Sequence, residues 1–398
     1  MTVVIVGASV AGIRTAQALR MQGFDGDITI IGEEAHLPYD KPPLSKEWLT
    51  GETPGPLVTE EQLAALAVDL RLGVRATSLD PRGRVVQTSA GHSVAYTTLV
   101  IATGLTPRML PGVVPPAGVH TMRTADDAVA LREALLTRAT AVVIGAGFIG
   151  AEFASAARRH GCGVSVVEPQ PTPMAHLLGD RVGAALAELH VRNGIRLHAG
   201  ATFDRFETTP DGRVRAVVLG DGRVLAADVV VVGIGATPAT RWLESSGLPL
   251  SDGVECDDQL RVHGYPDIFA AGDVARWPHA LYGHSLRIEH WSNANEHAAV
   301  VAAAVVGNPF PAPQVPYVWS DQYGHRIQII GRPSLGELVS MTGTAEEHLV
   351  GVYADGAGAV VGAVVVDDPR RMLQFRKAIM RRAPATELVA ADARPSAR

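Results

Sequence analysis

The sequence is poor in cysteine and in aromatic residues, and it has no long apolar run. Its only cysteines are Cys162 and Cys256. They are too far apart for a CxxC or CxxxxC motif, which excludes a sequence-local redox disulfide and a thiolate zinc site. No apolar run reaches the roughly twenty residues that cross a membrane. The net charge of −6 argues against wholesale nucleic-acid binding. We therefore expect a cytoplasmic protein that binds neither nucleic acid nor membrane.

The chain repeats one strand–turn–helix–strand pattern. A length of 398 residues suggests two or three domains, because one core rarely grows beyond about 250 residues. The first copy has strands at 2–6 and 27–31, a turn at 7–12 and a helix at 13–21. The second has strands at 140–144 and 163–167, a turn at 145–150 and a helix at 151–160. Two such units indicate a repeated dinucleotide-binding half.

The first turn, Gly7-Ala8-Ser9-Val10-Ala11-Gly12, has the spacing of a dinucleotide fingerprint. Gly7 allows a sharp turn, a small residue at Ser9 lets the backbone approach a pyrophosphate, and Gly12 lets helix and strand pack closely. Glu33 follows 21 residues after Gly12, where a carboxylate can accept hydrogen bonds from ribose hydroxyls. Ser9 departs from the strict GxGxxG pattern, and a tight turn that binds nothing is the alternative.

The second turn carries the complete pattern, Gly145-Ala146-Gly147-Phe148-Ile149-Gly150. Glu168 follows 18 residues after Gly150. A carboxylate there can pair with a free 2′-hydroxyl and repel a 2′-phosphate. Because no Arg or Lys occurs from Pro169 to Leu178, we predict a preference for NADH over NADPH.

Three further strands end on small residues. Residues 98–101 run into Ala102-Thr103-Gly104, and residues 229–232 run into a turn that contains Gly235. These two turns look like crossings between domains. Residues 268–271 lead into Gly272-Asp273. From about Tyr317 onward, new strands are expected at 326–330, 349–353 and 359–366, followed by a basic helix and a frayed Pro/Ala tail.

Together these motifs resemble the flavoproteins with two dinucleotide domains and a glutathione-reductase-like fold. The resemblance implies an α/β fold with two Rossmann-like domains and a smaller α+β C-terminal domain. The expected boundaries are 1–107 with 240–316 for FAD, 108–239 for NAD and 317–398 for the C-terminal domain. Asp273 would bind the ribityl–phosphate region of the flavin, although a helix N-cap is its alternative role.

A narrower resemblance spans nearly the whole chain. Residues 37–46 (LPYDKPPLSK), 287–294 (RIEHWSNA) and 319–323 (WSDQY) are similar to segments of the FAD-dependent ferredoxin reductases that serve bacterial oxygenases. Lys41 stands where that family often has Arg, which keeps a charge but loses bidentate geometry. The resemblance implies a set of FAD contacts: Gly7, Ser9, Gly12, Glu33, Lys41, Pro43, Lys46, Ala102, Thr103, Gly104, Asp273, Glu289, His290 and Trp291.

The same resemblance implies residues around the nicotinamide. Lys46 and Glu152 would face the isoalloxazine on the nicotinamide side as an ion pair, and Trp291 and Trp319 would shield the flavin. Each also has a structural reading, as a helix Glu or a core Trp. The implied NAD contacts are Gly145, Gly147, Phe148, Ile149, Gly150, Glu152, Glu168 and Gly235.

The absence of cysteine between Glu33 and Gly51 bears on the electron acceptor. Disulfide reductases and NADH oxidases or peroxidases of this fold keep a cysteine there. We therefore expect FAD to take a hydride from NADH and to deliver single electrons to an external [2Fe–2S] ferredoxin. The alternatives are a rubredoxin reductase, an NADH oxidase-like enzyme and a redox sensor resembling apoptosis-inducing factor.

Basic residues cluster near the C-terminus without an acid among them: Arg370, Arg371, Arg376, Lys377, Arg381 and Arg382. They could dock an acidic ferredoxin, or they could simply be a solvated helix face. His284, His290 and His297 have no metal-ligand spacing, so we expect no metal site. A monomer or a homodimer is expected.

Overall fold

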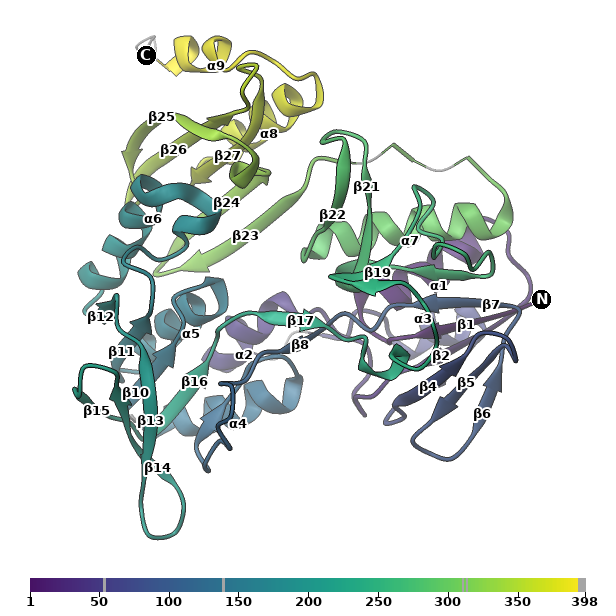
Figure 1. The fold of residues 1–398 in the computed structure, drawn as a ribbon, viewed down its shortest axis with the longest axis horizontal. Coiled ribbons are helices and arrows are strands. Elements are labelled where there is room, and N and C mark those ends of the chain that lie inside the picture. The colour runs from purple at the N-terminus through teal and green to yellow at the C-terminus, as the bar shows by residue number, and fades with distance from the viewer. Residues whose placement is uncertain (53–54, 138–139, 310, 313, 393–398) are drawn as a thin grey trace. The chain divides into compact units, whose positions relative to one another are not determined.

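The computed structural model describes residues 1–52, 55–137, 140–309, 311–312 and 314–392, and the chain forms two compact units (Figure 1). Unit 1 comprises Met1–Pro42, Pro54–Thr106 and Ala236–Gln314. Unit 2 comprises Pro43–Thr53, Pro107–Gly235 and Val315–Arg398. The C-terminal segment thus belongs to the same unit as the second fingerprint, and the expected three-domain division stays a prediction.

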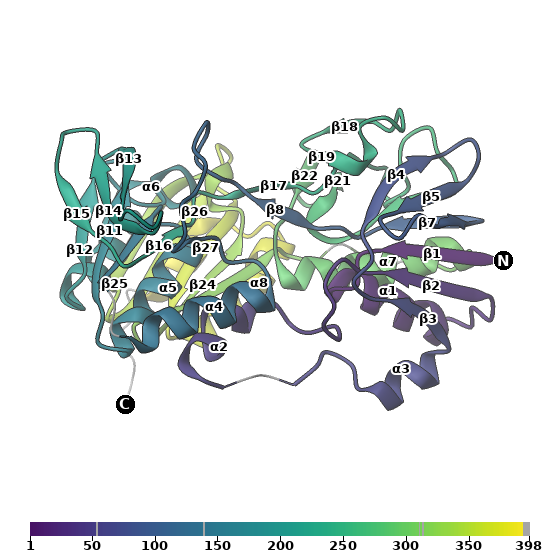
Figure 2. The same cartoon turned by 90° about the horizontal axis from the view of Figure 1, so that it is seen from below.

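Unit 1 is built on a five-stranded parallel sheet of order β20-β7-β1-β2-β3. Its strands are β1 (Thr2–Val6), β2 (Asp27–Ile31), β3 (Val68–Arg71), β7 (Thr98–Ile101) and β20 (Ile268–Ala270). Nearly every residue of β1 and β7 is buried, as in a sheet covered on both faces. Helices α1 (Val10–Met21) and α7 (Trp291–Val306) pack against each other beside this sheet (Figure 2).

Smaller elements complete unit 1. They are α3 (Glu60–Leu66), a sheet of β4 (Ala76–Asp80), β5 (Val85–Thr88) and β6 (Ser93–Ala95), and a sheet of β18 (Leu250–Ser251), β19 (Gly253–Glu255), β21 (Ala275–His279) and β22 (His284–Arg287). Two short 3₁₀ turns, η2 (Arg241–Leu243) and η3 (Gly272–Val274), also belong to it. The chain leaves unit 1 for the segment Pro107–Gly235 along β8 (Leu105–Pro107) and returns along β17 (Ala236–Pro238), and these two strands pair with each other.

Unit 2 repeats the parallel architecture in the order β12-β11-β10-β16-β9. The strands are β9 (Val119–His120), β10 (Thr140–Ile144), β11 (Gly163–Glu168), β12 (Arg196–Ala199) and β16 (Val229–Val232). The helices are α2 (Glu47–Thr50), α4 (Ala125–Leu136), α5 (Phe148–Arg159) and α6 (Ala175–Arg192). A small antiparallel sheet adds β13 (Phe203–Thr208), β14 (Val214–Leu219) and β15 (Val224–Ala226).

The C-terminal part of unit 2 is a five-stranded antiparallel sheet of order β23-β24-β27-β26-β25. Its strands are β23 (Tyr317–Gln322), β24 (His325–Gly331), β25 (Glu337–Thr344), β26 (Glu347–Ala354) and β27 (Val360–Val366). Helix α8 (Pro369–Met380) packs on β24 and β27 and is followed by α9 (Ala385–Asp392). The predicted α/β class, with two Rossmann-like parts and a smaller C-terminal part, is therefore confirmed.

Two local expectations need correction. Helices α1 and α5 begin at Val10 and Phe148, inside the segments expected to be turns, because the last residues of each fingerprint form the first helical turn. The tail expected to be frayed contains α9, which begins at Ala385. Leu388 of α9 is buried, which gives this helix an apolar contact that holds it in place. Residues 393–398 lie outside the described part of the chain.

Candidate functional site

The first fingerprint in unit 1 has no room for larger residues. Gly7 has a φ of +121°, and a Cβ at this position would lie 2.1 Å from the carbonyl oxygen of Ala102. A Cβ at Gly12 would lie 1.9 Å from the carbonyl oxygen of Gly7. Ser9 is the N-cap of α1 but makes no side-chain capping bond. The first N–H groups of α1 therefore lack intrahelical partners, as an anion site at a helix start requires.

Two acidic residues follow β2, and their carboxylates differ in exposure and in partners. Glu33 is exposed and lies 3.7 Å from the guanidinium of Arg75. Glu34, which the sequence did not single out, accepts a hydrogen bond from Tyr39 and forms a 2.8 Å ion pair with Lys41. The ammonium group of Lys41 thus pairs with Glu34, and its expected contact with a pyrophosphate stays a prediction.

The other unit 1 residues of the predicted FAD set lie in well-held turns. Ala102 is buried, and Thr103 donates its hydroxyl to the carbonyl of Ala239 at 2.9 Å. The carbonyl of Gly104 accepts the N–H of Ala239, also at 2.9 Å. These bonds fasten the two crossing segments to each other. The Gly272-Asp273 motif forms η3 at the end of β20, and its half-buried Asp273 follows a strand that is fully buried.

Arg287 and Trp291 organise the second segment of the resemblance. Arg287 donates to the carbonyl of Asp273 at 3.2 Å and to the carboxylate of Glu289 at 2.6 Å. His290 is the N-cap of α7, and Trp291 donates its indole N–H to Asp40 at 2.7 Å. Asp40 lies within the quoted 37–46 segment but was not predicted as a site residue.

The second fingerprint in unit 2 repeats this geometry. A Cβ at Gly145, whose φ is +103°, would lie 2.3 Å from the carbonyl oxygen of Gly233, and one at Gly150 would lie 2.1 Å from that of Gly145. At Gly147 and Gly235 no described residue other than the chain neighbours comes within 4 Å of the Cβ position, so the backbone there is open to a ligand. Phe148 is half-buried and Ile149 is exposed. Both turns therefore fit a dinucleotide.

Glu168 at the end of β11 is held by backbone N–H groups. One carboxylate oxygen accepts from Ala146 at 2.9 Å, and the other accepts from Gln170 at 3.0 Å. These bonds tie the carboxylate to the fingerprint turn itself. A ribose bound at this turn would meet a fixed negative charge.

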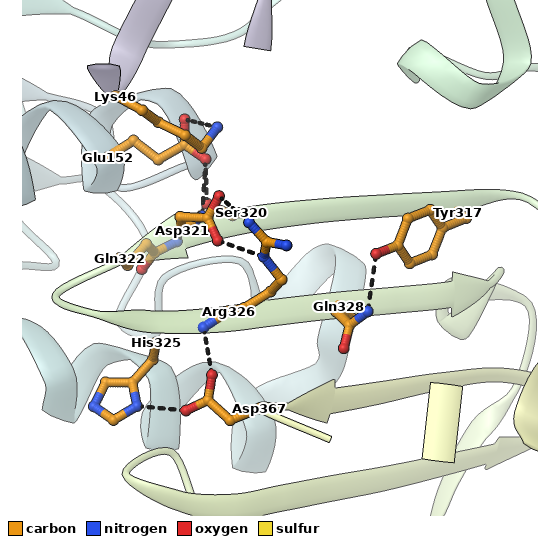
Figure 3. Close-up of polar contacts among 10 residues, drawn as sticks. All are labelled: Lys46, Glu152, Tyr317, Ser320, Asp321, Gln322, His325, Arg326, Gln328 and Asp367. Carbon is orange, nitrogen blue, oxygen red and sulfur yellow. Dashed lines mark hydrogen bonds and ion pairs between the residues drawn. The ribbon is translucent and has the colours of Figure 1, made fainter. Parts of the chain in front are cut away.

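Glu152 on α5 is the centre of a buried polar cluster in unit 2 (Figure 3). It is 4% exposed, and one of its oxygens accepts from Ser45 and lies 3.0 Å from the ammonium nitrogen of Lys46. Its other oxygen accepts the hydroxyl of Ser320 at 2.6 Å and the N–H of Asp321 at 3.3 Å. The structure therefore brings the predicted Lys46–Glu152 ion pair together and adds two serines that the sequence did not indicate.

This cluster continues through the C-terminal sheet. Asp321 accepts from the guanidinium of Arg326 at 2.7 Å, and the backbone N–H of Arg326 donates to Asp367 at 2.7 Å (Figure 3). His325 also bonds Asp367, at 2.8 Å. A cavity of about 240 Å³ borders Lys46, Glu152 and Arg326, so the buried carboxylate lies next to a polar opening.

Trp319 lies on the strand face opposite to the hydroxyl that bonds Glu152. Side chains alternate along a strand, so Trp319 of β23 faces opposite to its neighbour Ser320. The Trp319 ring is half-buried and stacks on Tyr317 with 5.8 Å between ring centroids. Its predicted place beside a flavin stays a prediction.

A second cavity, larger at about 320 Å³, lies in unit 1 near the amino ends of the strands of its parallel sheet. Its walls include Thr2, Asp27 and Asp69, which lie at or near the amino ends of β1, β2 and β3. In doubly wound sheets, ligands bind outside the carboxyl ends of the strands. This cavity is therefore not the dinucleotide site.

Both thiols are buried and free. Burial raises the pKa of Cys162 and, more strongly, that of Cys256. A buried thiol with a raised pKa is a poor nucleophile, which argues against either one as a redox partner of a cofactor. Within the described residues there is no His/Cys/Asp/Glu group that could hold a metal, and no helix long and apolar enough to span a membrane.

Most of the site residues that the sequence did not indicate lie inside the segments quoted for the family resemblance or next to a predicted residue. Asp40 and Ser45 lie in the 37–46 segment, and Ser320 lies in the 319–323 segment. Glu34 directly follows the predicted Glu33. Nothing in the sequence marked the buried His297 as more than a histidine without metal spacing.

Two family models match the chain. The pyridine nucleotide-disulphide oxidoreductase model matches residues 1–298, and the reductase C-terminal model matches residues 317–398. The ferredoxin–NAD(+) reductase component of the biphenyl dioxygenase system of Paraburkholderia xenovorans is 40% identical over 336 residues, or 83% of this chain and 81% of that protein. The ferredoxin reductase component of a Cupriavidus chlorobenzene dioxygenase is 37% identical and covers 95% of this chain and 93% of its own.

Solved structures agree with these relatives. Putidaredoxin reductase, in its covalent complex with putidaredoxin, matches with a TM-score of 0.93 and 30% identity over 99% of both chains. The ferredoxin reductase for the CYP199A2 system from Rhodopseudomonas palustris matches with a TM-score of 0.90 and 35% identity over 96% of this chain and 95% of that one. The chain therefore belongs to the pyridine nucleotide-disulphide oxidoreductase family, among the flavoproteins that carry a reductase C-terminal domain.

Proposed function

We propose that the protein is an FAD-dependent ferredoxin–NAD(+) reductase that passes electrons from NADH to an external [2Fe–2S] ferredoxin of an oxygenase system. The observation that carries this function is the presence of two glycine-tight dinucleotide turns in a chain whose two thiols are both buried and free. Such a chain can bind both cofactors but has no internal disulfide to reduce. The relatives named above are ferredoxin reductase components, in agreement with this reading.

Unit 1 would hold FAD and unit 2 would hold NADH. The flavin, when bound, accepts two electrons as a hydride and can release them singly. The N–H groups at the start of α1 and the turn at Gly7 would bind the FAD pyrophosphate, with Asp273 near the ribityl–phosphate region. The start of α5 would bind the NADH pyrophosphate, where Gly147 leaves the backbone open. No side chain is required as an acid or base, so the protein contributes placement and electrostatics.

Glu168 would select NADH. Its carboxylate is fixed by Ala146 and Gln170, so it cannot swing away from an incoming 2′-phosphate without losing both bonds. A ribose hydroxyl can still donate to its remaining lone pairs. NADPH would bring like charges together and should bind more weakly.

The Lys46–Glu152 pair would orient the reacting rings. Glu152 is nine-tenths buried and receives four donors, which fixes both carboxylate oxygens. Fixed charges in a dry site act strongly on nearby charge redistribution. A hydride acceptor placed beside this pair would therefore experience a defined field.

Helix α8 would contribute to ferredoxin docking. Arg370 and Lys377 are exposed, whereas Arg381 pairs with Glu387 and Arg382 lies 3.0 Å from Asp355. The docking charge of α8 would therefore come first from the exposed Arg370 and Lys377. An acidic ferredoxin would be attracted to this face, and its association rate would fall with salt.

The deciding experiment measures cytochrome c reduction by the purified holoprotein with NADH, with and without a [2Fe–2S] ferredoxin. Strong dependence on ferredoxin, with two cytochromes reduced per NADH, is the expected result. NADH consumption that ignores ferredoxin and follows oxygen would indicate an oxidase instead. Rubredoxin in place of ferredoxin serves as the matched acceptor, and a higher rate with rubredoxin would reassign the partner.

A further inference from the structure

Gly272 begins the 3₁₀ turn η3 and packs between helices α1 and α7 of unit 1. Gly272 has a φ of +75°, and a Cβ there would lie 2.9 Å from the Cβ of Ala11 on α1 and 3.7 Å from that of Ala294 on α7. Ala271 is anchored on the other side, since its N–H donates to the carbonyl of Ile101 at 2.9 Å. The turn that carries Asp273 thus sits where the fingerprint helix meets α7.

His297 holds this turn by a hydrogen bond. One helical turn beyond Ala294, its Nδ1 accepts the backbone N–H of Gly272 at 3.1 Å. The His297 side chain is 0% exposed. A hydrogen bond in so dry a place is stronger than in water, and losing the acceptor would leave a buried N–H without a partner.

The surroundings of the His297 imidazole indicate that it is neutral and which of its nitrogens carries the proton. An imidazole whose Nδ1 accepts must carry its proton on Nε2 when it is neutral. Burial lowers the pKa of His297 to about 3, in keeping with a neutral ring. The ring meets Trp277 edge to face, with 4.8 Å between centroids, and its buried Nε2 has no hydrogen-bond partner among the described residues. The polar function of His297 is therefore directed to Gly272.

We propose that His297 is a positioning residue for the flavin nucleotide: by accepting the N–H of Gly272, it fixes the peptide that aims Asp273 at FAD. The inference rests on the proposed placement of FAD in unit 1. It also assigns the Gly272 N–H to the protein rather than to the ligand. The phosphate and ribityl groups must then be bound by the Asp273 side of the turn and by the start of α1.

Two variants that branch at the same carbon test the acceptor. His297→Asn keeps an oxygen at the position of Nδ1, whereas His297→Leu puts a methyl group there. FAD binding is measured by reconstitution of the apoprotein, together with the visible circular dichroism of the bound flavin. We expect the Kd of His297→Leu to rise about tenfold, which corresponds to about 1.4 kcal/mol, and its flavin spectrum to change. His297→Asn should stay within about twofold of the parent protein.

Trp277→Phe is the control for packing, because Trp277 touches the same imidazole without contacting Gly272 through a hydrogen bond. It should lower the melting temperature but leave the Kd for FAD and the flavin spectrum unchanged. Equal FAD affinity in the parent and in His297→Leu, or equal weakening in the Leu and Asn variants, overturns the inference alone. A parent protein that binds no FAD overturns the proposed function instead.

A second measurement keeps the inference testable if His297→Leu does not fold. In the parent holoprotein labelled with ¹⁵N-histidine, the nitrogen shifts report which ring nitrogen carries the proton. We expect the Nε2–H form for His297, with the Nδ1 signal of a hydrogen-bond acceptor. A proton on Nδ1 is incompatible with acceptance from Gly272 and would overturn the proposal.

Discussion

Glu152 and Ser320 are 168 positions apart in the chain and are joined by a 2.6 Å hydrogen bond between a buried carboxylate and a buried hydroxyl. The bond connects α5, which opens at the second fingerprint, to β23 of the C-terminal sheet. The C-terminal sheet therefore takes part in fixing a charged side chain on the helix that opens at the second fingerprint.

Removing this donor should destabilise the protein. Ser320→Ala is expected to lower the free energy of unfolding by about 1–3 kcal/mol, because a buried carboxylate loses a hydroxyl partner. Urea denaturation measures the change. Ser334→Ala removes an exposed serine from the same C-terminal part and should stay within about 0.5 kcal/mol. Similar losses in the two variants would contradict the role given to Ser320.

Replacing Lys46 and replacing Glu152 should lower the free energy of unfolding by different amounts. Lys46→Met leaves Glu152 with three donors, from Ser45, Ser320 and the N–H of Asp321. Glu152→Met instead removes the acceptor on which all of these donors converge. We expect about 1–2 kcal/mol for the first variant and about 3–5 kcal/mol for the second, by chemical denaturation. The reverse order would show that Lys46, not Glu152, organises the cluster.

The choice of nicotinamide cofactor should depend on Glu168. We expect the parent protein to have a higher kcat/KM with NADH than with NADPH. Glu168→Gln keeps the size of the side chain and removes its charge, so the ratio of the two kcat/KM values should fall about tenfold, or about 1.4 kcal/mol. Glu188→Gln, an exposed change on α6, is the matched control. A parent preference for NADPH would contradict the assignment.

Stability should fall in acid partly because of His190. Burial lowers the pKa of His190 to about 4, and its Nδ1 bonds the hydroxyl of Tyr323 at 2.7 Å. An unfolded histidine titrates near 6.5. Between about pH 6.5 and pH 4 the unfolded state therefore binds the extra proton, and the free energy of unfolding decreases as the pH falls. Once the pH is below 4, protonation of His190 in the unfolded state has lowered the free energy of unfolding by about 3 kcal/mol.

Urea denaturation of the parent protein and of His190→Gln from pH 7.5 to pH 4.5 isolates this effect from the carboxylates, which titrate in both. The pH dependence should be flatter in the variant. Parallel curves would mean that His190 keeps an ordinary pKa in the folded protein.

Ferredoxin reduction should respond to charge on α8. The double variant Arg370→Glu/Lys377→Glu should raise the KM for ferredoxin at low salt and weaken its salt dependence, with little effect on the reduction of ferricyanide, a small acceptor. Arg82→Glu places the same kind of change on an exposed turn of unit 1. An equal effect of Arg82→Glu, or no effect of the double variant, would place the docking surface elsewhere.

Local chemistry was readable from the sequence by itself. The turns at Gly7 and Gly145 follow from short-range backbone constraints, because each needs a positive φ, of +121° and +103°, that a residue without a Cβ adopts readily. The buried β-branched strands before these turns, and Glu168 at the end of the next strand, follow from the same pattern. The missing cysteine near residue 43 likewise directed the function toward an external acceptor.

Only the tertiary structure decided which distant groups meet. The resemblance implied Lys41 as a charge for the pyrophosphate, which stays a prediction, and the fold adds the ion pair between its ammonium and Glu34. The resemblance marked Glu152 as a partner of Lys46, but not the hydroxyl of Ser320, which arrives from a strand whose place depends on the order of the C-terminal sheet. His297 reaches Gly272 because α7 packs on α1, and no local pattern encodes that contact. Backbone turns are determined within a few residues, whereas hydrogen bonds between distant side chains depend on how whole elements pack.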